Sequence, residues 1–253
     1  MPSYQPRFQL TPQILKQIAA ICELIGRWSA GSDLTASPTL RRDNRIRTIQ
    51  ASLAIENNTL TLEQVTALFD GKRVLGQPRE IQEVRNAILA YEHLEHWQPA
   101  RVDDLLAAHR LLMSALVDAP GDYRSGGVGI YRGETLVHMA RPANRVSTLI
   151  NDLLGWLQGT DDHPLIASCV FHYEFEFIHP FDDGNGRMGR LWQTLILSQW
   201  QPMLAYLPVD SLVHSRQAQY YEVLSECDRA ADSTRFIEFM LQALLDAMLE
   251  TQV

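Results

Sequence analysis

The 253-residue sequence predicts a mainly α-helical protein that contains one β-hairpin. Apolar residues recur at helical spacing through most of the chain, and Ser, Thr or Pro precedes several of these runs, as is typical of helix N-termini. The pattern changes between residues 120 and 139, where proline and glycine turns accompany two short β-prone runs. We therefore expect residues 128–131 and 135–139 to form the only strands.

Four helices are expected in the first hundred residues. Their start signals are Thr11-Pro12, Ser37-Pro38, the capping box Thr61–Gln64 and Pro78, and their stop signals include Gly31, Asn57-Asn58 and Asp70-Gly71. Pro99 marks the expected boundary between an N-terminal helical region, residues 1–99, and a core, residues 100–253. The connection is too short to predict two independently folded domains.

Six further helices are expected in the second region. They should span residues 102–116, 143–158, 163–178, 187–200, 211–229 and 234–250. Trp192 and Trp200 are interpreted as core residues of one of these helices. In the first region, the arginine-rich stretch Arg41–Arg47 is interpreted as a solvated helix face, with contact to an acidic partner as the alternative.

Composition limits the classes of function. The net charge of −8 argues against general nucleic-acid binding, which depends on basic patches. Cys22, Cys169 and Cys227 match no zinc-binding spacing and are typical of reduced thiols. No apolar run reaches about 18 residues, and the N-terminus lacks the plan of a signal peptide. We expect a cytoplasmic protein that binds neither nucleic acid nor membrane.

The twelve residues from His179 to Arg190 carry the densest chemistry of the chain. A glycine-rich turn that leads into a helix N-terminus presents backbone N–H groups and the positive end of the helix dipole, which favours phosphate. Arg187 and Arg190 lie three residues apart and therefore share one face of the first turn. Asp183 offers the hard oxygen ligand that Mg²⁺ prefers, and His179 has the pKa range suited to proton transfer. Together they predict a Mg²⁺-nucleotide site with a base beside it.

This stretch resembles the Fic motif, His-x-Phe-x-Asp/Glu-Gly-Asn-Gly-Arg-x-x-Arg. The fixed positions are filled by His179, Phe181, Asp183, Gly184, Asn185, Gly186, Arg187 and Arg190. Gly121–Arg124, followed by the expected hairpin, resembles the flap of the same family. The resemblance covers roughly residues 100–245. It implies a Fic-fold helical bundle with one β-hairpin flap, preceded by an N-terminal helical region.

A second signature lies in the N-terminal region. Ser52–Asn57 matches the family's inhibitory pattern, Ser/Thr-x-x-x-Glu-Gly/Asn, so the helix of about residues 39–58 resembles an inhibitory helix. The resemblance implies that Glu56 forms a bidentate ion pair with Arg190 and occupies donors meant for the nucleotide's γ-phosphate. Ser52 lies one turn earlier on the same face and is expected to brace the loop before the motif.

Members of this family mostly transfer AMP from ATP to a hydroxyl group of a protein. The resemblance therefore implies that His179 is the general base, that Asp183 holds Mg²⁺ and that Phe181 anchors the loop in the core. ATP would be bound by Asp183, Gly184, Asn185, Gly186, Arg187, Met188, Gly189 and Arg190, with Tyr220 and Tyr221 beside the adenosine. Asp228 stands where relatives carry an Asn that completes this pocket.

The hairpin is expected to bind the target protein by strand addition, which reads backbone more than side chains. The expected docking residues are Val128, Gly129, Ile130 and Tyr131. The leading hypothesis is a protein adenylyltransferase, restrained by Glu56, that modifies a Ser, Thr or Tyr of a target protein or of itself.

Three alternatives stay open at this point. The same site could remove AMP from a modified protein, with Glu56 orienting a water, or the chain could be a nucleotide-binding regulator that does not turn over. A homodimer is also open, as relatives often dimerise. His172, Glu176 and His179 have the spacing of a metal-binding helix face, but a ligated His179 could not act as a base, so His172 is interpreted as a packed helix residue.

Overall fold

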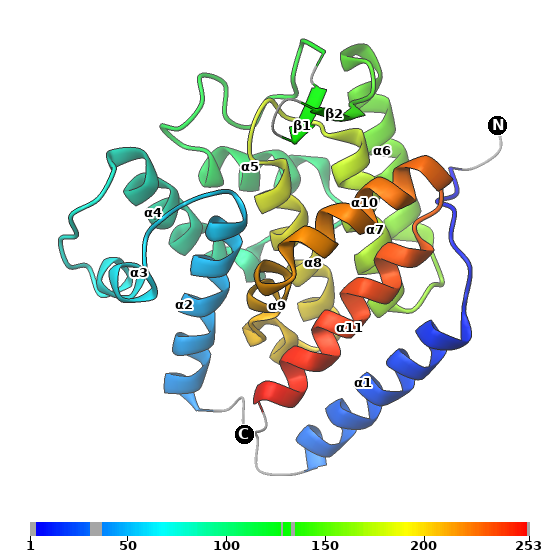
Figure 1. Ribbon diagram of the computed structural model, residues 1–253, viewed down its shortest axis with the longest axis horizontal. Helices are drawn as coiled ribbons and strands as arrows, with labels where there is room; N and C mark the ends of the chain where they lie inside the picture. The colour runs from blue at the N-terminus through cyan, green and yellow to red at the C-terminus, as the bar shows by residue number, and fades with distance from the viewer. Residues whose placement is uncertain (1–3, 31–36, 128, 133–134, 252–253) are drawn as a thin grey trace.

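The computed structural model describes residues 4–30, 37–127, 129–132 and 135–251. It confirms the mainly helical prediction (Figure 1). The N-terminal region contains α1 (Pro12–Ala30), α2 (Pro38–Ile55), α3 (Leu62–Phe69), α4 (Pro78–Glu92) and the 3₁₀ turn η2 (Leu94–His96). The second region contains α5 (Val102–Leu112), β1 (Gly129–Arg132), β2 (Thr135–Met139), α6 (Ala143–Gly159), α7 (Pro164–Ile178), α8 (Asn185–Trp200), η3 (Pro202–Tyr206), α9 (Val209–Ser215), α10 (Gln217–Ala230) and α11 (Thr234–Thr251).

Helix ends follow the local chemistry that the sequence indicated. Ser37 and Thr61 accept N-capping hydrogen bonds from backbone N–H groups, and Thr61 forms the reciprocal capping box with Gln64. Asn57, just after α2, has φ 68°, the left-handed conformation that Asn tolerates. The strands β1 and β2 pair antiparallel, with a register shift between Ile130 and Tyr131. Val128, one of the expected docking residues, lies outside the described residues.

Two helix predictions are wrong in their extent. The expected helix 211–229 is two helices that meet at Arg216. Both helices contact α11, and α9 also packs against α2. Helix α5 ends at Leu112 and not at residue 116. Ala115 there has φ 59°, and the side-chain amide of Asn86 donates to the carbonyls of Leu112 and Ser114. These hydrogen bonds satisfy the carbonyls at the helix end, so the chain can turn away.

Helices α7 and α8 form the centre of the bundle and carry the motif between them (Figure 1). One apolar core cluster joins Ile49 and Leu53 of α2 to Phe175 and Trp192, and the other joins α1 to α11. Both clusters therefore contain residues from each side of position 99. The boundary between an N-terminal region and a core at residue 99 therefore stays a prediction from the sequence. None of the helices in the described ranges has the length and hydropathy needed to cross a membrane.

Trp192 joins the two regions directly. Its ring is buried and stacks on Trp97 at a centroid distance of 6.1 Å, and its indole Nε1–H donates to the carbonyl of Pro99 at 2.9 Å. Helix α8 is thereby fixed to the chain segment that leaves the N-terminal region.

Trp192→Ala should lower the free energy of unfolding by about 3–5 kcal/mol, because it removes a large buried ring and leaves the Pro99 carbonyl without its donor. Urea denaturation followed by circular dichroism measures the loss. The matched control is Leu75→Ala, at a side chain that is 93% exposed, which should leave the midpoint unchanged. Equal effects of the two substitutions would contradict this role of Trp192.

Candidate active site

The loop between α7 and α8 is held in an unusual backbone conformation. His179 ends α7 with φ 52° in the left-handed region, and Gly184 precedes α8 with φ 86°. A Cβ atom on Gly184 would lie 2.6 Å from the Met113 sulfur, so glycine is required there for space as well as for conformation. The side chain of Asn185 accepts from the Phe181 N–H and donates to the Phe181 carbonyl. Asn185 thus closes the loop with its side chain.

His109 supports this loop from α5. Its Nδ1 accepts a hydrogen bond from the Gly121 N–H, so its Nε2–H donates to the Asp183 carbonyl at 3.0 Å. The imidazole stacks on the Phe181 ring at a centroid distance of 3.6 Å. Burial lowers the pKa of His109 to about 4, so the ring is neutral at pH 7. Phe181 is fully buried, as expected for the anchor of the loop.

Arg124 fixes the carbonyl groups on the other side of the loop. It is 3% exposed, and its guanidinium donates to the carbonyls of Ile178, His179, Gly126 and Arg141. Its backbone N–H also donates to the Pro180 carbonyl at 3.0 Å. Since Gly126 and Arg141 flank the hairpin, one side chain ties the base of the hairpin to the backbone of His179.

Asp183 lies in a network of four charged side chains. One carboxylate oxygen accepts from Arg187 at 2.9 Å and from the Gly184 N–H, while the other accepts from Arg79 of α4 at 2.9 Å. Glu83, also on α4, lies 3.4 Å from Arg187 and 3.6 Å from Arg79. The Asp183 side chain is 42% exposed, so it faces solvent from the edge of the loop.

Arg190 is buried, and its contacts come largely from α2. Its Nε donates to the Ser52 hydroxyl at 3.0 Å, and its Nη2 donates to the Ser52 carbonyl at 2.9 Å and to Glu56 Oε1 at 2.8 Å. The expected Glu56–Arg190 contact is therefore present, but it uses one carboxylate oxygen and is not bidentate. The expectation that Ser52 braces the loop before the motif is wrong, since Ser52 binds Arg190 itself.

Two further observations define the surroundings of Arg190. A Cβ atom on Gly186 would lie 2.3 Å from Glu56 Oε1, so the Glu56 carboxylate rests on the first turn of α8. Asp210 of α9 is also buried, with a carboxylate oxygen 3.9 Å from Arg190 Nε. Burial alone would lower the pKa of Arg190, but the charges of Glu56 and Asp210 outweigh it and raise the pKa. The guanidinium thus stays charged in the interior.

Helix α10 holds the end of α2 and carries the tyrosine pair. Gln217 Nε2 donates to the Ile55 carbonyl at 2.7 Å, and the Tyr221 hydroxyl donates to the same carbonyl at 3.4 Å. Tyr220 is buried, with its hydroxyl 3.1 Å from His172 Nε2. Asp228 accepts a hydrogen bond from the Tyr173 hydroxyl at 3.1 Å. Only Tyr221 of the pair is therefore partly open beside Glu56.

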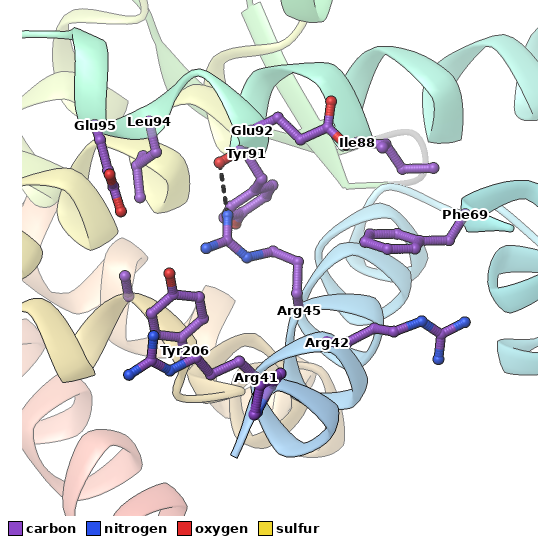
Figure 2. Close-up of a pocket in the computed structure, with 12 residues that line it drawn as sticks. Arg41, Arg42, Arg45, Phe69, Ile88, Tyr91, Glu92, Leu94, Glu95 and Tyr206 are labelled. Atoms are coloured by element: carbon purple, nitrogen blue, oxygen red, sulfur yellow. Dashed lines mark hydrogen bonds between the residues drawn. The ribbon is translucent and has the colours of Figure 1, made fainter. Parts of the chain in front are cut away.

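The opposite end of α2 borders a cleft of about 410 Å³ between α2, α4 and η3. Figure 2 shows Arg45 reaching from α2 to the backbone carbonyl of Tyr91, at 2.7 Å. The guanidinium lies over the rings of both Tyr91 and Tyr206, at 5.0 and 5.1 Å from their centroids. Burial lowers the pKa of Arg45. The interpretation of Arg41–Arg47 as a solvated face is therefore wrong for Arg45, whose cation–π contacts hold α2 in place.

The residues present fit a magnesium ion bound together with a nucleotide. Mg²⁺ commonly takes one or two carboxylates and completes its shell with water and phosphate oxygens. Asp183 is a partly exposed carboxylate beside the N-terminus of α8, and helix N-termini favour anions. Over the described ranges, no three histidine, cysteine or carboxylate side chains gather into a metal-binding cluster. Both ring nitrogens of His172 lie within hydrogen-bonding distance of Gln193 or Tyr220, which agrees with its interpretation as a packed residue.

The motif residues thus come together on one loop and one helix turn, and α2 supplies Ser52 and Glu56 from more than a hundred residues away. Met188, expected at the nucleotide, has its side chain in the apolar core. Gly189 faces His172 and Glu176 closely enough to exclude a Cβ atom, so it serves close packing of α7 on α8. Sequence reasoning missed His109, Arg79 and Gln217 as parts of the site. Their partners lie far away in the chain, and no local pattern marks them.

Comparison with known proteins agrees with this geometry. The family model described as the Fic/DOC family matches residues 99–197. A Fic family protein of known structure from Desulfovibrio desulfuricans is 65% identical, with a TM-score of 0.94 over 98% of this chain and 76% of that one. The chain belongs to the Fic/DOC family. This assignment confirms the resemblance stated from the motif.

Curated Fic relatives are more distant and longer. "Protein adenylyltransferase Fic" of Nematostella vectensis is 28% identical over 76% of this chain, and "Protein adenylyltransferase fic-1" of Caenorhabditis elegans is 27% identical over 83% of it. The chain covers 45% and 42% of these relatives, so it spans less than half of their length. The names of both relatives describe protein adenylyltransferases.

Arg124→Gln should lower the free energy of unfolding by roughly 2–4 kcal/mol, because several buried carbonyls lose a charged donor. Hydrogen exchange of backbone N–H groups should also become faster at residues 124–126, and at His179 and Phe181 in the loop between α7 and α8. Arg145→Gln, at an exposed arginine of α6, is the matched control. Unchanged exchange in the Arg124 variant would contradict a role in holding the loop.

Stability should fall as the pH is lowered from 7 to 4. The pKa of His109 is about 4 in the folded protein against an ordinary value of 6.5, so between these pH values the unfolded chain binds more protons. In this interval, His109 should lower the free energy of unfolding by about 1.4 kcal/mol for each pH unit by which the pH is lowered.

His109→Phe keeps the stack on Phe181 but cannot titrate. It should therefore reduce the slope of stability against pH measured by urea denaturation, although it lowers stability overall. His96→Phe, at an exposed histidine, should leave the slope unchanged. An undiminished slope in His109→Phe would refute the assignment of this pH dependence to His109.

Proposed function

We propose that this Fic protein is an adenylyltransferase that moves AMP from ATP to a Ser, Thr or Tyr hydroxyl of a target protein, and that Glu56 restrains it. The observation that carries the proposal is the buried Arg190, whose guanidinium lies beside Gly186 in the first turn of α8 and donates to Glu56 at the C-terminal end of α2. The names of the curated relatives support the choice of AMP transfer among phosphate reactions.

In the proposed reaction, His179 takes the proton of the target hydroxyl while the oxygen attacks the α-phosphorus of ATP. The bond between the α-phosphorus and the bridging oxygen breaks, and pyrophosphate leaves with the electron pair. His179 then releases the proton to solvent. Arg187, Arg190 and the N–H groups of the α8 first turn would offset the charge that moves onto the phosphate oxygens.

Asp183 would hold the magnesium ion that accompanies ATP, which supplies positive charge beside the α- and β-phosphates. For this, the carboxylate oxygen bound to Arg79 has to become available. Arg79 is 56% exposed, so its Nη2 could turn to solvent or to a phosphate oxygen while its Nη1 keeps the hydrogen bond to the Leu116 carbonyl. Asn185, whose side chain is bonded to Phe181, would contribute its backbone alone.

Restraint by Glu56 follows from competition for one guanidinium. Arg190 Nη2 donates to Glu56 Oε1 and to the Ser52 carbonyl, so a γ-phosphate that needs the same donor has to displace the carboxylate. The Glu56 oxygen also covers Gly186, where phosphate oxygens would approach the backbone. ATP could therefore bind in this state in a pose that does not react.

The reverse reaction is a second candidate because of how Glu56 is held. Only Oε1 is bonded to Arg190, and the side chain is 33% exposed, so the second oxygen could orient a water molecule toward an AMP-modified side chain. His179 would then donate a proton to the departing hydroxyl oxygen. In both directions the paired strands β1 and β2 would offer an edge on which a target segment binds by strand addition.

The test is intact-mass measurement after incubation with ATP and Mg²⁺. Glu56→Gly should raise AMP incorporation into the protein itself or a lysate protein by about ten- to a hundredfold, since one charged contact no longer competes with ATP. His179→Ala in the Glu56→Gly background should abolish it. The matched control is Asp70→Gly, which removes a helix-capping acid paired with Arg42 far from the motif.

Each candidate function has its own outcome in this experiment. Absence of AMP in every variant would refute the transferase proposal, and tight ATP binding without turnover would favour a regulator. Loss of AMP from a premodified target only when Glu56 is present would favour removal. A magnesium requirement is tested by repeating the incubation with EDTA, which should stop incorporation.

A further inference from the structure

The Glu176 side chain, which is only 13% exposed, places a carboxyl group inside the site, and the proposed reaction gives this group no task. It lies on the last turn of α7, three residues before His179, and its Oε2 is 4.0 Å from His179 Nδ1. Its other oxygen, Oε1, is 3.9 Å from His172 Nε2 and has no hydrogen-bond partner within the part of the chain that the structure describes. A carboxyl group held in the interior without such partners is costly unless something binds it.

The pKa of Glu176 depends on the charged groups around the motif. The ionisable groups that face it are Glu56 of α2, Arg190 of α8, Tyr220, Tyr221 and Asp228 of α10, and His172 and His179 of α7 itself. Burial, and then the negative charge of Glu56, raise the pKa of Glu176 to about 8. With Glu56 on Arg190, the Glu176 carboxyl group therefore carries its proton at pH 7.

We propose that Glu176 positions His179 by accepting a hydrogen bond from its Nδ1–H, and that Glu56 suppresses this arrangement while it is bound to Arg190. An ionised Glu176 keeps the imidazole proton on Nδ1 and leaves Nε2 to accept a proton, which is the tautomer that a general base needs. The inference rests on the proposed function in one respect. It assumes that Nε2 of His179 accepts the proton of the target hydroxyl.

A protonated Glu176 has the opposite effect on the ring. Its O–H donates to Nδ1, so the imidazole proton moves to Nε2 and the ring cannot accept a proton there. Departure of Glu56 removes a negative charge near Glu176 and thereby favours its ionised form. Glu56 thus restrains the site in two ways, since it occupies Arg190 and keeps His179 in the tautomer that is not basic at Nε2.

The chain offers a matched control on the same helix. Glu174 is also largely buried, but its carboxylate accepts a hydrogen bond from the Tyr4 hydroxyl at 2.6 Å. Glu174→Gln and Glu176→Gln therefore each replace one carboxyl group of α7 by an amide. Glu176 lies beside His179, whereas Glu174 lies beside Tyr4. Both substitutions keep the size and shape of the side chain.

The experiment is proton–nitrogen NMR of the full chain labelled with ¹⁵N-histidine, in the Glu56→Gly background without nucleotide. The His179 signal is assigned by its loss in His179→Ala. At pH 8 its ring should be the Nδ1–H tautomer. Glu176→Gln should lower the pKa of His179 by at least about one pH unit, because an opposite charge about 4 Å away is lost, whereas Glu174→Gln should leave it unchanged.

Equal His179 titration in the Glu176 and Glu174 variants would overturn the proposal, as would an Nε2–H ring in Glu56→Gly at pH 8. If Glu176→Gln does not fold, Glu176→Met, of similar length, replaces it. The NMR readout does not need AMP transfer, so a shifted pKa without any AMP incorporation would uphold the positioning role and refute the adenylyltransferase. Where transfer is measured, the acidic limb of the kcat–pH profile should move with the same shift.

Discussion

The buried guanidinium of Arg190 is the group on which the rest of this site depends. A charged side chain in the interior needs acceptors for its N–H groups, and here α2 supplies three of them through Ser52 and Glu56. Asp210 adds negative charge from α9. The same requirement that would let Arg190 bind a phosphate group therefore draws α2 onto the motif when no phosphate is present, and it joins the N-terminal region to the Fic core.

The loop of the motif is rigid because its polar backbone groups are used by side chains from distant elements. His109 binds the Asp183 carbonyl, Asn185 binds both polar groups of Phe181, and Arg124 binds the carbonyls of Ile178 and His179. Left-handed conformations at His179 and Gly184 persist because these contacts determine the path of the chain on both sides. A preorganised turn of this kind favours phosphate binding, since little ordering remains to be done when the ligand arrives.

The sequence predicted what depends on neighbouring residues and missed what depends on tertiary contacts. The motif, the capping box and the hairpin are local, and Glu56 was identified because Ser52–Asn57 resembles the short inhibitory pattern of the family. His109, Arg124 and Arg79 act on partners 74, 55 and 104 positions away, and nothing in the residues beside them marks those partners. Arg45 was misjudged for the same reason, because a pattern of charges cannot reveal that two tyrosines from other elements enclose it. The break at Arg216 was likewise missed, and it lets α9 contact α2 as well as α11.

Helix α2 is held at two separate points, and this limits how the restraint on Arg190 can be lifted. Near its middle, Arg45 lies over the rings of Tyr91 and Tyr206, and at its C-terminal end Gln217 and Tyr221 donate to the Ile55 carbonyl. Displacement of the whole helix would break both sets of contacts. We therefore expect the Glu56 side chain, just after Ile55, to be the part that moves. Rotation of a side chain is faster than displacement of a helix and disturbs less of the core.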